Sequence, residues 1–232
     1  MMIRFQNVTK IYYSRANSRP IIALEDISFE IQPGEFLSVV GRSGAGKTTL
    51  IKLLIGEEKL TEGKILFKDK NIAKIKSSEL QEIRKKMGVV YQDYRLLFSK
   101  TVYENVSYIL EVRGVADKDI ARDVPRVLEM VGLQERVKNF PQELSSGEQQ
   151  RLVIARALIH QPEVIIADEP TGNLDPYNTF EVINLFKRIN ESGTTVILAT
   201  HNKRIIDGLT KRVVSLEAGR LIRDEQSGKF IL

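Results

Sequence analysis

The chain has 232 residues, of which 42% are hydrophobic and 28% are charged, values typical of a globular protein with its own core. No apolar run reaches the roughly 20 residues that a membrane-spanning helix needs, and the N-terminus lacks the apolar segment of a signal peptide. The absence of cysteine excludes disulfides and thiolate metal sites. The net charge of +5 would suit an anionic partner, but without any long block of like charges it indicates solvated surfaces. We therefore expect a cytosolic protein.

Strand-like and helical patterns alternate along the chain. In the first hundred residues a helix is expected at 47–56 and strands at 2–8, 21–31, 34–41, 63–69 and 85–92. Between Tyr103 and Arg136 the apolar residues follow helical spacing, as at Val124, Val127, Leu128 and Val131. The last third returns to a helix at 177–192 and strands at 163–169, 194–200 and 211–219. The alternation predicts an α/β fold: one domain over residues 1–232, with a helical subdomain at about residues 93–160.

A glycine-rich loop, GRSGAGKT, fits the pattern G-x-x-x-x-G-K-[ST] between a strand and a helix. Its glycines let the backbone approach phosphates closely, with N–H groups pointing inward. Lys47 would place a charge on the β- and γ-phosphates, and the Thr48 hydroxyl would ligate Mg²⁺. Such a loop also occurs as a plain tight turn, but these flanks favour a nucleotide site. The candidate contacts are Gly41, Arg42, Ser43, Gly44, Ala45, Gly46, Lys47, Thr48 and Thr49.

A second motif, VIIADEP, is an apolar run that ends in two carboxylates. The run predicts a buried strand of a parallel sheet, and ligands of such folds gather at the carboxyl ends of the strands. Asp168 would hold Mg²⁺ through its water shell, and Glu169 would orient and deprotonate an attacking water. The alternative is a pair of acids that ends a strand and opens a turn. A phosphate loop in the same chain favours the metal and base roles.

Three further polar residues accompany these motifs. Gln92 ends the expected strand at 85–92, Asp175 comes shortly after the acidic strand, and His201 follows the strand at 194–200. A lone histidine is more often structural than functional. Its place at a strand end beside a phosphate site nevertheless favours a contact between His201 and the γ-phosphate.

The segment ELSSGEQQRLVIARAL, residues 143–158, predicts an amphipathic helix with an unusual start. Ser145, Ser146 and Gly147 place hydroxyls and free N–H groups where the helix dipole favours an anion. No lysine lies nearby in the sequence to complete an anion site. We therefore expect this segment to be one half of an anion-binding site, with the positive charge of that site supplied by another part of the assembly.

Taken together, these motifs resemble those of the ATP-binding subunits of ABC transporters, over essentially the whole chain. GRSGAGKT resembles the Walker A loop, VIIADE the Walker B strand and LSSGEQQR the signature, while Gln92, GNLD and His201 correspond to the Q-loop, D-loop and switch histidine. The resemblance implies a P-loop NTPase fold of the ABC type, with an antiparallel β subdomain and an α-helical subdomain. It also implies ATP and Mg²⁺ as cofactors.

The same resemblance implies roles for individual residues. Glu169, His201, Gln92 and Lys47 would be catalytic, with Thr48, Gln92 and Asp168 around the metal. Two copies would form a homodimer head to tail on ATP, with Asp175 in the D-loop. The signature residues that would contact the ATP of the other copy are Ser145, Ser146, Gly147 and Glu148.

Two expectations concern positions where the resemblance is weaker. An aromatic ring after the first strand stacks on adenine in this family, and the spacing favours Tyr12 over Tyr13, although such a pair also occurs as ordinary sheet packing. Ser146 stands where the family usually has glycine. If that position needs a positive φ, serine would cost on the order of 1 kcal/mol and loosen the closed dimer.

Longer segments, such as DEPTGNLDP and the tail RVVSLEAGRLIRDEQSGKF, resemble the cell-division branch of the family. That resemblance implies a polytopic membrane partner of the FtsX kind, control of cell-wall hydrolases, and a peripheral place on the inner face of the cell membrane. The alternative is the ATPase of a lipoprotein-release or macrolide-export transporter. ABC ATPases that act on DNA or ribosomes usually carry a second nucleotide-binding domain or an extra insertion, so we expect no nucleic-acid partner. Intact Glu169 and His201 argue against a non-enzymatic nucleotide sensor.

In this family a short helix of the membrane subunit docks between the Q-loop and the helical subdomain. Here the segment after Gln92 carries Leu96, Leu97 and Phe98 in a row. Three consecutive apolar residues cannot all face one core by helical or strand periodicity, so we expect at least one of them to be exposed. Packing beneath the helical subdomain is the alternative for these side chains.

Overall fold

The computed structural model describes residues 1–13 and 20–228. Its strands are β1 (Ile3–Tyr13), β2 (Pro20–Ile31), β3 (Phe36–Val40), β4 (Glu62–Phe67), β5 (Lys70–Asn71), β6 (Met87–Val90), β7 (Val164–Asp168), β8 (Thr195–Thr200), β9 (Arg212–Glu217) and β10 (Arg220–Glu225). Its α-helices are α1 (Lys47–Leu54), α2 (Ser77–Arg84), α3 (Val102–Val112), α4 (Asp117–Met130), α5 (Ser146–Leu158), α6 (Pro176–Glu191) and α7 (Lys203–Leu209). Two short 3₁₀ helices, η1 (Gln134–Arg136) and η2 (Pro141–Glu143), precede α5.

The larger sheet has six strands in the order β10-β9-β3-β8-β7-β6. From β9 to β6 every neighbouring pair is parallel, and β10 pairs antiparallel to β9. Every residue of β3, β7 and β8 is buried, as expected for parallel strands covered on both faces. Their carboxyl ends therefore meet along one edge, where polar side chains can be held in a rigid frame.

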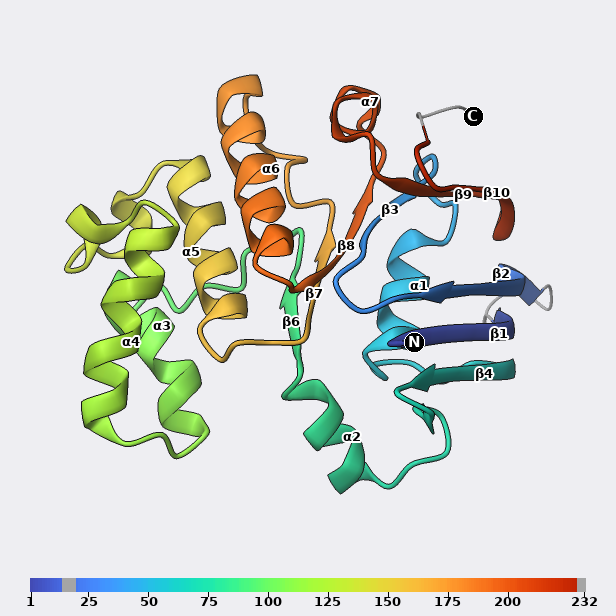
Figure 1. The fold of residues 1–232 in the computed structure, drawn as a ribbon, viewed down its shortest axis with the longest axis horizontal. Helices are drawn as coiled ribbons and strands as arrows, with labels where there is room; N and C mark the ends of the chain where they lie inside the picture. Colours follow the sequence, from blue (N-terminus) through green and yellow to red (C-terminus); the bar gives the residue numbers. More distant parts are fainter. Residues whose placement is uncertain (14–19, 229–232) are drawn as a thin grey trace.

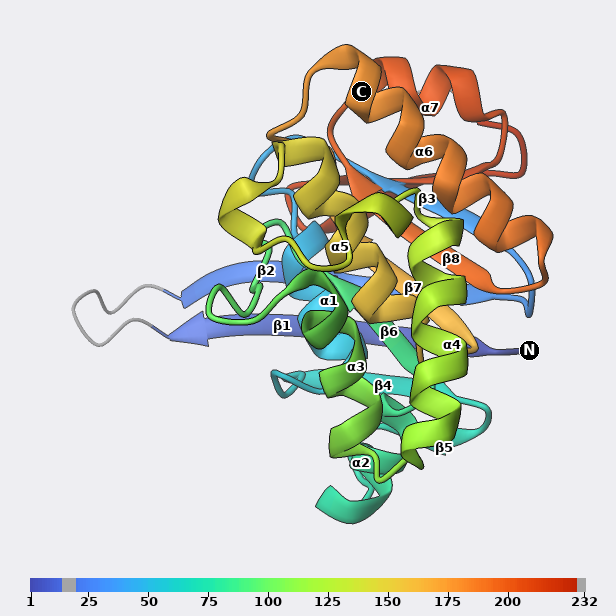
Figure 2. The same cartoon turned by 90° about the vertical axis from the view of Figure 1, so that its left-hand side faces the viewer.

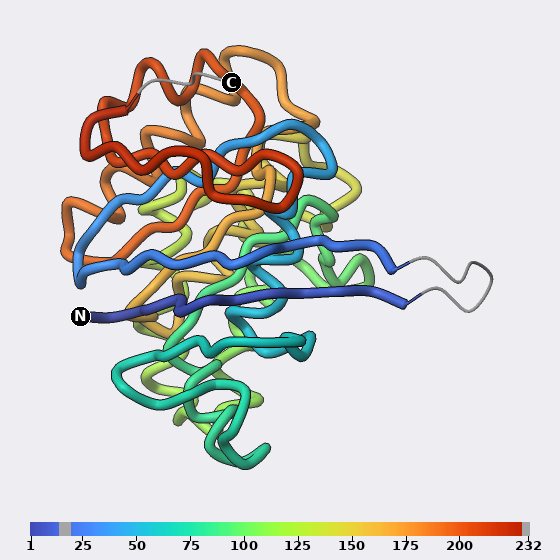
Figure 3. Tube along the Cα trace, turned by 90° about the vertical axis from the view of Figure 1, so that its right-hand side faces the viewer, coloured from blue at the N-terminus to red at the C-terminus, as the bar shows by residue number. Residues whose placement is uncertain are grey.

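The smaller sheet is antiparallel, in the order β2-β1-β4-β5. In Figure 1, α1 lies between the two sheets, and α3, α4 and α5 are grouped at the opposite end of the molecule from the antiparallel sheet. Figure 3 shows β1 and β2 running side by side as one long hairpin. This mixed architecture confirms the predicted α/β class with its antiparallel β part and its helical part.

Residues of β7 alternate between two hydrophobic cores. Ile166 belongs to the core that joins α1 to both sheets, together with Leu53 and Phe5. Ile165 belongs to the other core, which joins the opposite face of the sheet to α3, α4, α5 and α6. Since successive strand residues point to opposite faces, one strand anchors both cores and fixes the position of its own carboxyl end.

The short strand β5, the helices α2 and α7 and the strand β10 were not anticipated from the sequence pattern. The helix α2 is polar and buries only Ile83, so it lacks the apolar stripe that periodicity detects. A tight turn in which Ala218 and Gly219 both have positive φ joins β9 to β10 and allows them to pair as a hairpin. No helix in the described part of the chain is both long enough and apolar enough to cross a membrane.

A partly buried ion cluster ties β9 and β10 to the turn between β2 and β3. The Arg212 side chain is 9% exposed and donates from Nε and Nη2 to Asp224 at 2.7 and 2.6 Å. Its Nη1 donates to the Glu35 carboxylate at 2.8 Å and to the Glu30 carbonyl at 2.7 Å. The bonds to Asp224 and Glu35 raise the pKa of Arg212, so this guanidinium stays charged.

We expect Arg212→Leu to lower the free energy of unfolding by about 2 kcal/mol, because two carboxylates lose their counter-charge in a partly buried site. Arg220→Leu is the matched control, since Arg220 makes a similar bidentate pair with Glu25 at an exposed position, where such pairs contribute little. Urea unfolding followed by circular dichroism measures both. An equal loss in the two variants would show that burial of Arg212 is unimportant.

Candidate nucleotide-binding and catalytic site

The phosphate loop connects the carboxyl end of β3 to the start of α1. Gly46, the N-cap residue of α1, has φ 105° and ψ 1°, a conformation that costs a residue with a Cβ. A Cβ there would also lie 2.6 Å from the Ala23 carbonyl oxygen and from a Leu24 methyl group. The glycine therefore serves two purposes: it turns the chain into the helix, and it lets β2 pack directly against the loop.

Lys47 is buried at the first position of α1, with its side chain 6% exposed. Its Nζ donates to the Gly41 carbonyl at 2.7 Å and to the Arg42 carbonyl at 3.3 Å. The same ammonium lies 3.2 Å from Oε1 of Glu169. The loop thus curls around its own lysine and presents a positive charge at the carboxyl edge of the sheet.

Glu169 follows the last residue of β7 and has φ 48°, in the left-handed region. Its N–H donates to the Ala199 carbonyl of β8 at 2.9 Å, which fixes this turn. Its carboxylate lies 2.8 Å from Nδ1 of His201 and accepts from the His201 N–H at 3.3 Å. A non-glycine residue in this conformation costs roughly 1–2 kcal/mol, so the surrounding contacts stabilise an otherwise unfavourable backbone that aims the carboxylate at Lys47 and His201.

Asp168, the last residue of β7, is 7% exposed. Burial raises the pKa of its carboxyl group, and a hydrogen bond with the Thr48 side chain opposes that shift. Its Oδ1 has no hydrogen-bond partner among the described residues. A buried carboxylate oxygen without a donor beside a threonine hydroxyl fits a hard cation such as Mg²⁺. Residues 1–13 and 20–228 contain no group of three or more acidic, histidine or cysteine side chains arranged to hold a metal ion, so phosphate oxygens and water would complete such a shell.

Gln92 is exposed and lies just after β6. Its amide nitrogen faces Gly172, in the turn that follows Glu169; a Cβ on that glycine would lie 3.7 Å from Nε2. Tyr91, beside it, donates to Glu57, and the Arg95 guanidinium lies 3.6 Å from the centre of the Tyr91 ring. The segment that carries Gln92 is thereby fixed on both sides.

Tyr12 lies near the end of β1, and its hydroxyl donates to Oε2 of Glu58 at 2.6 Å. Lys10 lies 4.6 Å from the centre of the same ring and 3.1 Å from the Glu58 carboxylate. Burial raises the pKa of Tyr12, and the Glu58 hydrogen bond adds to the shift. Lys10 and Glu58 were not predicted from the sequence, because they act on Tyr12 through side chains that only the fold brings together. They hold the ring with a cation on one face, so a stacking base would use the opposite face.

The signature segment begins α5 with a capping box. Ser145 is the N-cap; its Oγ accepts from the Glu148 N–H at 3.3 Å, and the Glu148 carboxylate accepts from the Ser145 N–H at 2.8 Å. Arg136 donates to the other Glu148 oxygen at 2.9 Å. Ser146 is the first residue of the helix and does not have positive φ. The expectation of backbone strain at Ser146 is therefore wrong: serine fits this position, because a helical N1 residue needs no left-handed backbone.

Gly147 is the constrained residue of the signature, for a different reason. A Cβ on it would collide with the side-chain amide of Asn178 in α6. Asn178 in turn donates from both its N–H and its side-chain amide to Asp175, the N-cap residue of α6. These hydrogen bonds lower the pKa of Asp175. The starts of α5 and α6 are thus in direct contact, and the sequence did not reveal this pairing.

Within one chain the predicted residues form two groups. Lys47, Glu169 and His201 are joined by hydrogen bonds and ion pairs, and Thr48 is joined to Asp168. In the described part of the chain, no hydrogen bond or ion pair joins Ser145, Ser146, Gly147 or Glu148 to the phosphate loop. Apart from bonds within the capping box and the helix, their polar partners are Tyr94 and Arg136. This is the separation expected if the signature is half of a site completed by another copy.

The model of the ABC transporter family matches residues 24–172, more than half of the chain. The chain belongs to the ABC transporter family. Among curated relatives, the cell division ATP-binding protein FtsE of Streptococcus pneumoniae is 50% identical over 208 residues, covering 90% of each chain. The protein of the same name in Bacillus subtilis is 48% identical over 229 residues, covering 99% of this chain and 98% of the relative. Its counterpart in Escherichia coli is 43% identical over 220 residues, covering 95% and 97%.

Solved structures of this family share the whole fold. A dimeric post-hydrolysis state of the ATP-binding cassette MJ0796, bound to ADP and Pi, matches with a TM-score of 0.87 and 33% identity, covering 99% of this chain and all of the other. The cbiO1 protein of Clostridium perfringens matches with a TM-score of 0.87 and 28% identity, covering 97% of this chain and 88% of the other. These matches confirm the P-loop fold of the ABC type predicted from the motifs, and with it the class of enzyme, an ATPase. The roles of individual residues remain predictions.

We expect Gly147→Ala to lower the free energy of unfolding by about 1–3 kcal/mol, because the new methyl group must displace Asn178 and the start of α6. Ser146→Gly is the neighbouring control. Its position is exposed and helical, so glycine there should cost less than about 1 kcal/mol and leave ATP-dependent dimerisation unchanged. Urea unfolding and size-exclusion chromatography with Mg·ATP measure the two effects. A dimer tightened by Ser146→Gly would show that serine does strain this position.

Proposed function

We propose that this chain is the ATP-hydrolysing subunit of a bacterial cell-division complex, in which two copies dimerise head to tail on ATP and drive an FtsX-like polytopic membrane protein that regulates cell-wall hydrolases. The relatives named above support cell division over the alternative, an ATPase of lipoprotein release or macrolide export. The solved structures of MJ0796 are dimeric, which supports a homodimer. Through its membrane partner the chain would lie on the cytoplasmic face of the membrane.

The observation that carries the proposed chemistry is the Glu169 carboxylate, which lies 3.2 Å from Nζ of Lys47 and 2.8 Å from Nδ1 of His201. Lys47 and His201 flank the place where a γ-phosphate would be held, and Glu169 is aimed at the same place. In this structure the Glu169 carboxylate neutralises the positive charge of Lys47. A phosphate bound there would displace the carboxylate from Lys47 and leave it free to accept a proton from water.

The metal would be held by Thr48 and Asp168, with Gln92 close to the turn after Glu169. Bound Mg²⁺ would neutralise charge on the β- and γ-phosphates. Tyr12 would stack on the adenine, oriented by Glu58 and Lys10. The remaining ligands would be the backbone N–H groups of residues 41–46, at the N-terminus of α1.

The signature would meet the ATP of the other copy through the N-terminus of α5. The N–H groups of the first helical turn lack partners inside the helix, and the dipole favours an anion there. The Ser145 hydroxyl oxygen accepts the capping bond, so its proton stays available for a phosphate oxygen. Glu148 has its charge balanced by Arg136 and serves this site as part of the cap.

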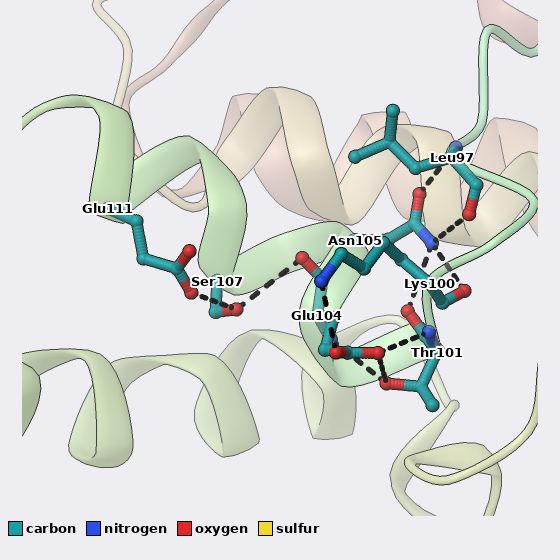
Figure 4. A network of polar contacts seen from close by, with 7 residues as sticks. All are labelled: Leu97, Lys100, Thr101, Glu104, Asn105, Ser107 and Glu111. Carbon is teal, nitrogen blue, oxygen red and sulfur yellow. Dashed lines mark hydrogen bonds and ion pairs between the residues drawn. The ribbon is translucent and has the colours of Figure 1, made fainter.

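A surface for the membrane partner is expected on the segment that follows Gln92. Leu96 is buried, Leu97 is half-buried and Phe98 is 51% exposed, which confirms that this apolar run cannot be buried entirely. Asn105 is fully buried and holds the segment in place: its Oδ1 accepts from the Leu97 N–H at 2.9 Å (Figure 4). Its Nδ2 donates to the carbonyls of Leu97, Lys100 and Thr101 at 2.9–3.0 Å. Phe98 is therefore displayed on a fixed loop.

The same segment is tied to the signature helix. Arg156 of α5 donates from Nη1 to the Arg95 carbonyl, and the Tyr94 hydroxyl lies 3.5 Å from the Ser146 carbonyl oxygen. A partner that moved Phe98 would thus act on α5 through short contacts. This link supports the proposal that nucleotide state and membrane partner are coupled through the loop of residues 92–98.

We expect Glu169→Gln to keep Mg·ATP binding and to slow hydrolysis by roughly 10²-fold or more, because the amide cannot accept the proton of water. The variant should accumulate as an ATP-bound dimer on size-exclusion chromatography. Glu163→Gln is the matched control, since Glu163 precedes the other end of β7 and pairs with Lys68 and Lys86. Lys47→Ala should instead lose nucleotide affinity. Wild-type turnover in Glu169→Gln would exclude Glu169 as the base.

We expect Phe98→Asp to leave folding and basal ATPase activity nearly unchanged and to abolish association with the membrane subunit, because a charge replaces an exposed apolar contact. Met130→Asp, at a similarly exposed apolar position on α4, is the control. Detergent pull-down, ATPase assay and circular dichroism separate the cases. Loss of fold would show that Phe98 is structural, and retained association would place the docking surface elsewhere.

A further inference from the structure

Phe140 is an exposed aromatic residue close to the signature. It precedes η2 and is 42% exposed. The short helix is held firmly to α5, since Nε2 of Gln149 donates to the Pro141 and Leu144 carbonyls at 2.9 and 3.3 Å. The Phe140 N–H donates to the Glu143 carboxylate at 2.6 Å. Phe140 therefore keeps a fixed position relative to Ser145, although nothing in the proposed chemistry uses it.

A second exposed apolar surface lies on the hairpin of β1 and β2. Ile21 is 61% exposed and pairs directly across the hairpin with Tyr12, so the two side chains share one face. Ile22 is 49% exposed and pairs with Ile11, on the opposite face. Through Ala23 and Leu24, this hairpin packs against Gly46 of the phosphate loop. Ile21 thus has a fixed position relative to the phosphate loop, at the end where the base would stack.

Both surfaces lie on the same side of the molecule. In Figure 2 the hairpin of β1 and β2 projects at the left, and the yellow-green segment before α5 and the start of α5 lie on that side as well. A head-to-tail dimer apposes the signature of each copy to the phosphate loop of the other, with two-fold symmetry. The surface beside the signature of one copy then meets the surface beside the phosphate loop of the other copy, and symmetry repeats this contact at the second nucleotide.

We propose that Phe140 of each copy packs against Ile21 of the partner subunit beside the adenine end of the nucleotide, so that the occupant of this exposed surface is a second copy of the same chain. The proposal rests on the head-to-tail dimer of the proposed function, with which the surface is continuous. The contact is apolar and lies beside Tyr12, so it would also exclude water from the stacked base. Symmetry places it at both nucleotides.

The contact predicts an effect on dimerisation that is separate from nucleotide binding by one chain. In the Glu169→Gln background with Mg·ATP, Phe140→Ser should raise the dimer dissociation constant by at least about tenfold, because two apolar contacts are lost per dimer. The affinity of the monomer for ATP should not change, since Phe140 does not reach the nucleotide of its own chain. Met130→Ser, an exposed methionine on α4, is the control and should leave both quantities unchanged.

Cross-linking tests the geometry directly, because the natural chain has no cysteine. Phe140→Cys combined with Ile21→Cys, in the Glu169→Gln background, should form a disulfide between copies with Mg·ATP and copper phenanthroline as oxidant, and much less without nucleotide. Phe140→Cys with Ile22→Cys is the matched control. Its second thiol is displaced by one residue and points to the other face, beyond the short Cβ separation that a disulfide needs.

Each outcome decides the matter. Preferential ATP-dependent linkage through position 21 supports the proposal. If chromatography shows the ATP-bound dimer but neither pair links, or both link equally, Phe140 lies elsewhere and the proposal is wrong while the proposed function stands. If the Glu169→Gln parent forms no dimer with Mg·ATP, the head-to-tail dimer itself fails, and this contact fails with it. If Phe140→Ser dimerises normally but loses association with the membrane subunit, the surface belongs to that partner, which also overturns the proposal.

Discussion

The ion pair between Lys47 and Glu169 is the constraint on which the rest of the site depends. The two side chains are 6% and 11% exposed, and each would be costly to bury alone. The loop carbonyls and His201 supply the additional hydrogen bonds that such a pair requires. The left-handed backbone of Glu169 belongs to the same arrangement, since it turns the carboxylate away from the buried strand and toward the charge. Parallel strands buried on both faces hold these three groups in one frame.

In this frame the anion site at Lys47 is neutralised by Glu169, whereas at the start of α5 the neighbouring cation, Arg136, is already paired with Glu148. A γ-phosphate at Lys47 would take over the countercharge now provided by Glu169, so binding and activation of the base would be the same event. The N-terminus of α5 offers its anion the helix dipole, free N–H groups and the Ser145 hydroxyl, but no unpaired charge. Its contact with α6 at Gly147 and Asn178 means that an anion drawn to the signature would also act on the N-cap at Asp175.

Local motifs were readable from the sequence because their chemistry lies in consecutive residues. The phosphate loop, the acidic strand end and the strand-end positions of Gln92 and His201 follow from short patterns, and the fold class follows from their alternation. The contacts of Tyr12 with Glu58, and of Gly147 with Asn178, could not be predicted in this way, since each joins distant segments whose register only the folded sheet and helices determine. The wrong expectation at Ser146 has the same origin. We expected this position to need the backbone freedom of glycine, but the residue that must be glycine is Gly147, because it packs against Asn178 of α6.

The loop between β6 and α3 connects the catalytic edge of the sheet to the signature helix α5. Both the oxygen and the nitrogen of the Asn105 side-chain amide hold backbone groups of that loop, and a satisfied buried polar network favours one conformation. The loop is thereby rigid where it displays Phe98, and its other contacts lead to Tyr91, to α5 and to the turn after Glu169. Because this rigid loop contacts both α5 and the turn after Glu169, a displacement of α5 would move the loop without unfolding it. Motion of α5 toward a partner's nucleotide would consequently shift the surface at Phe98. Under the proposed function, this shift is how hydrolysis at the edge of the sheet would act on the membrane partner.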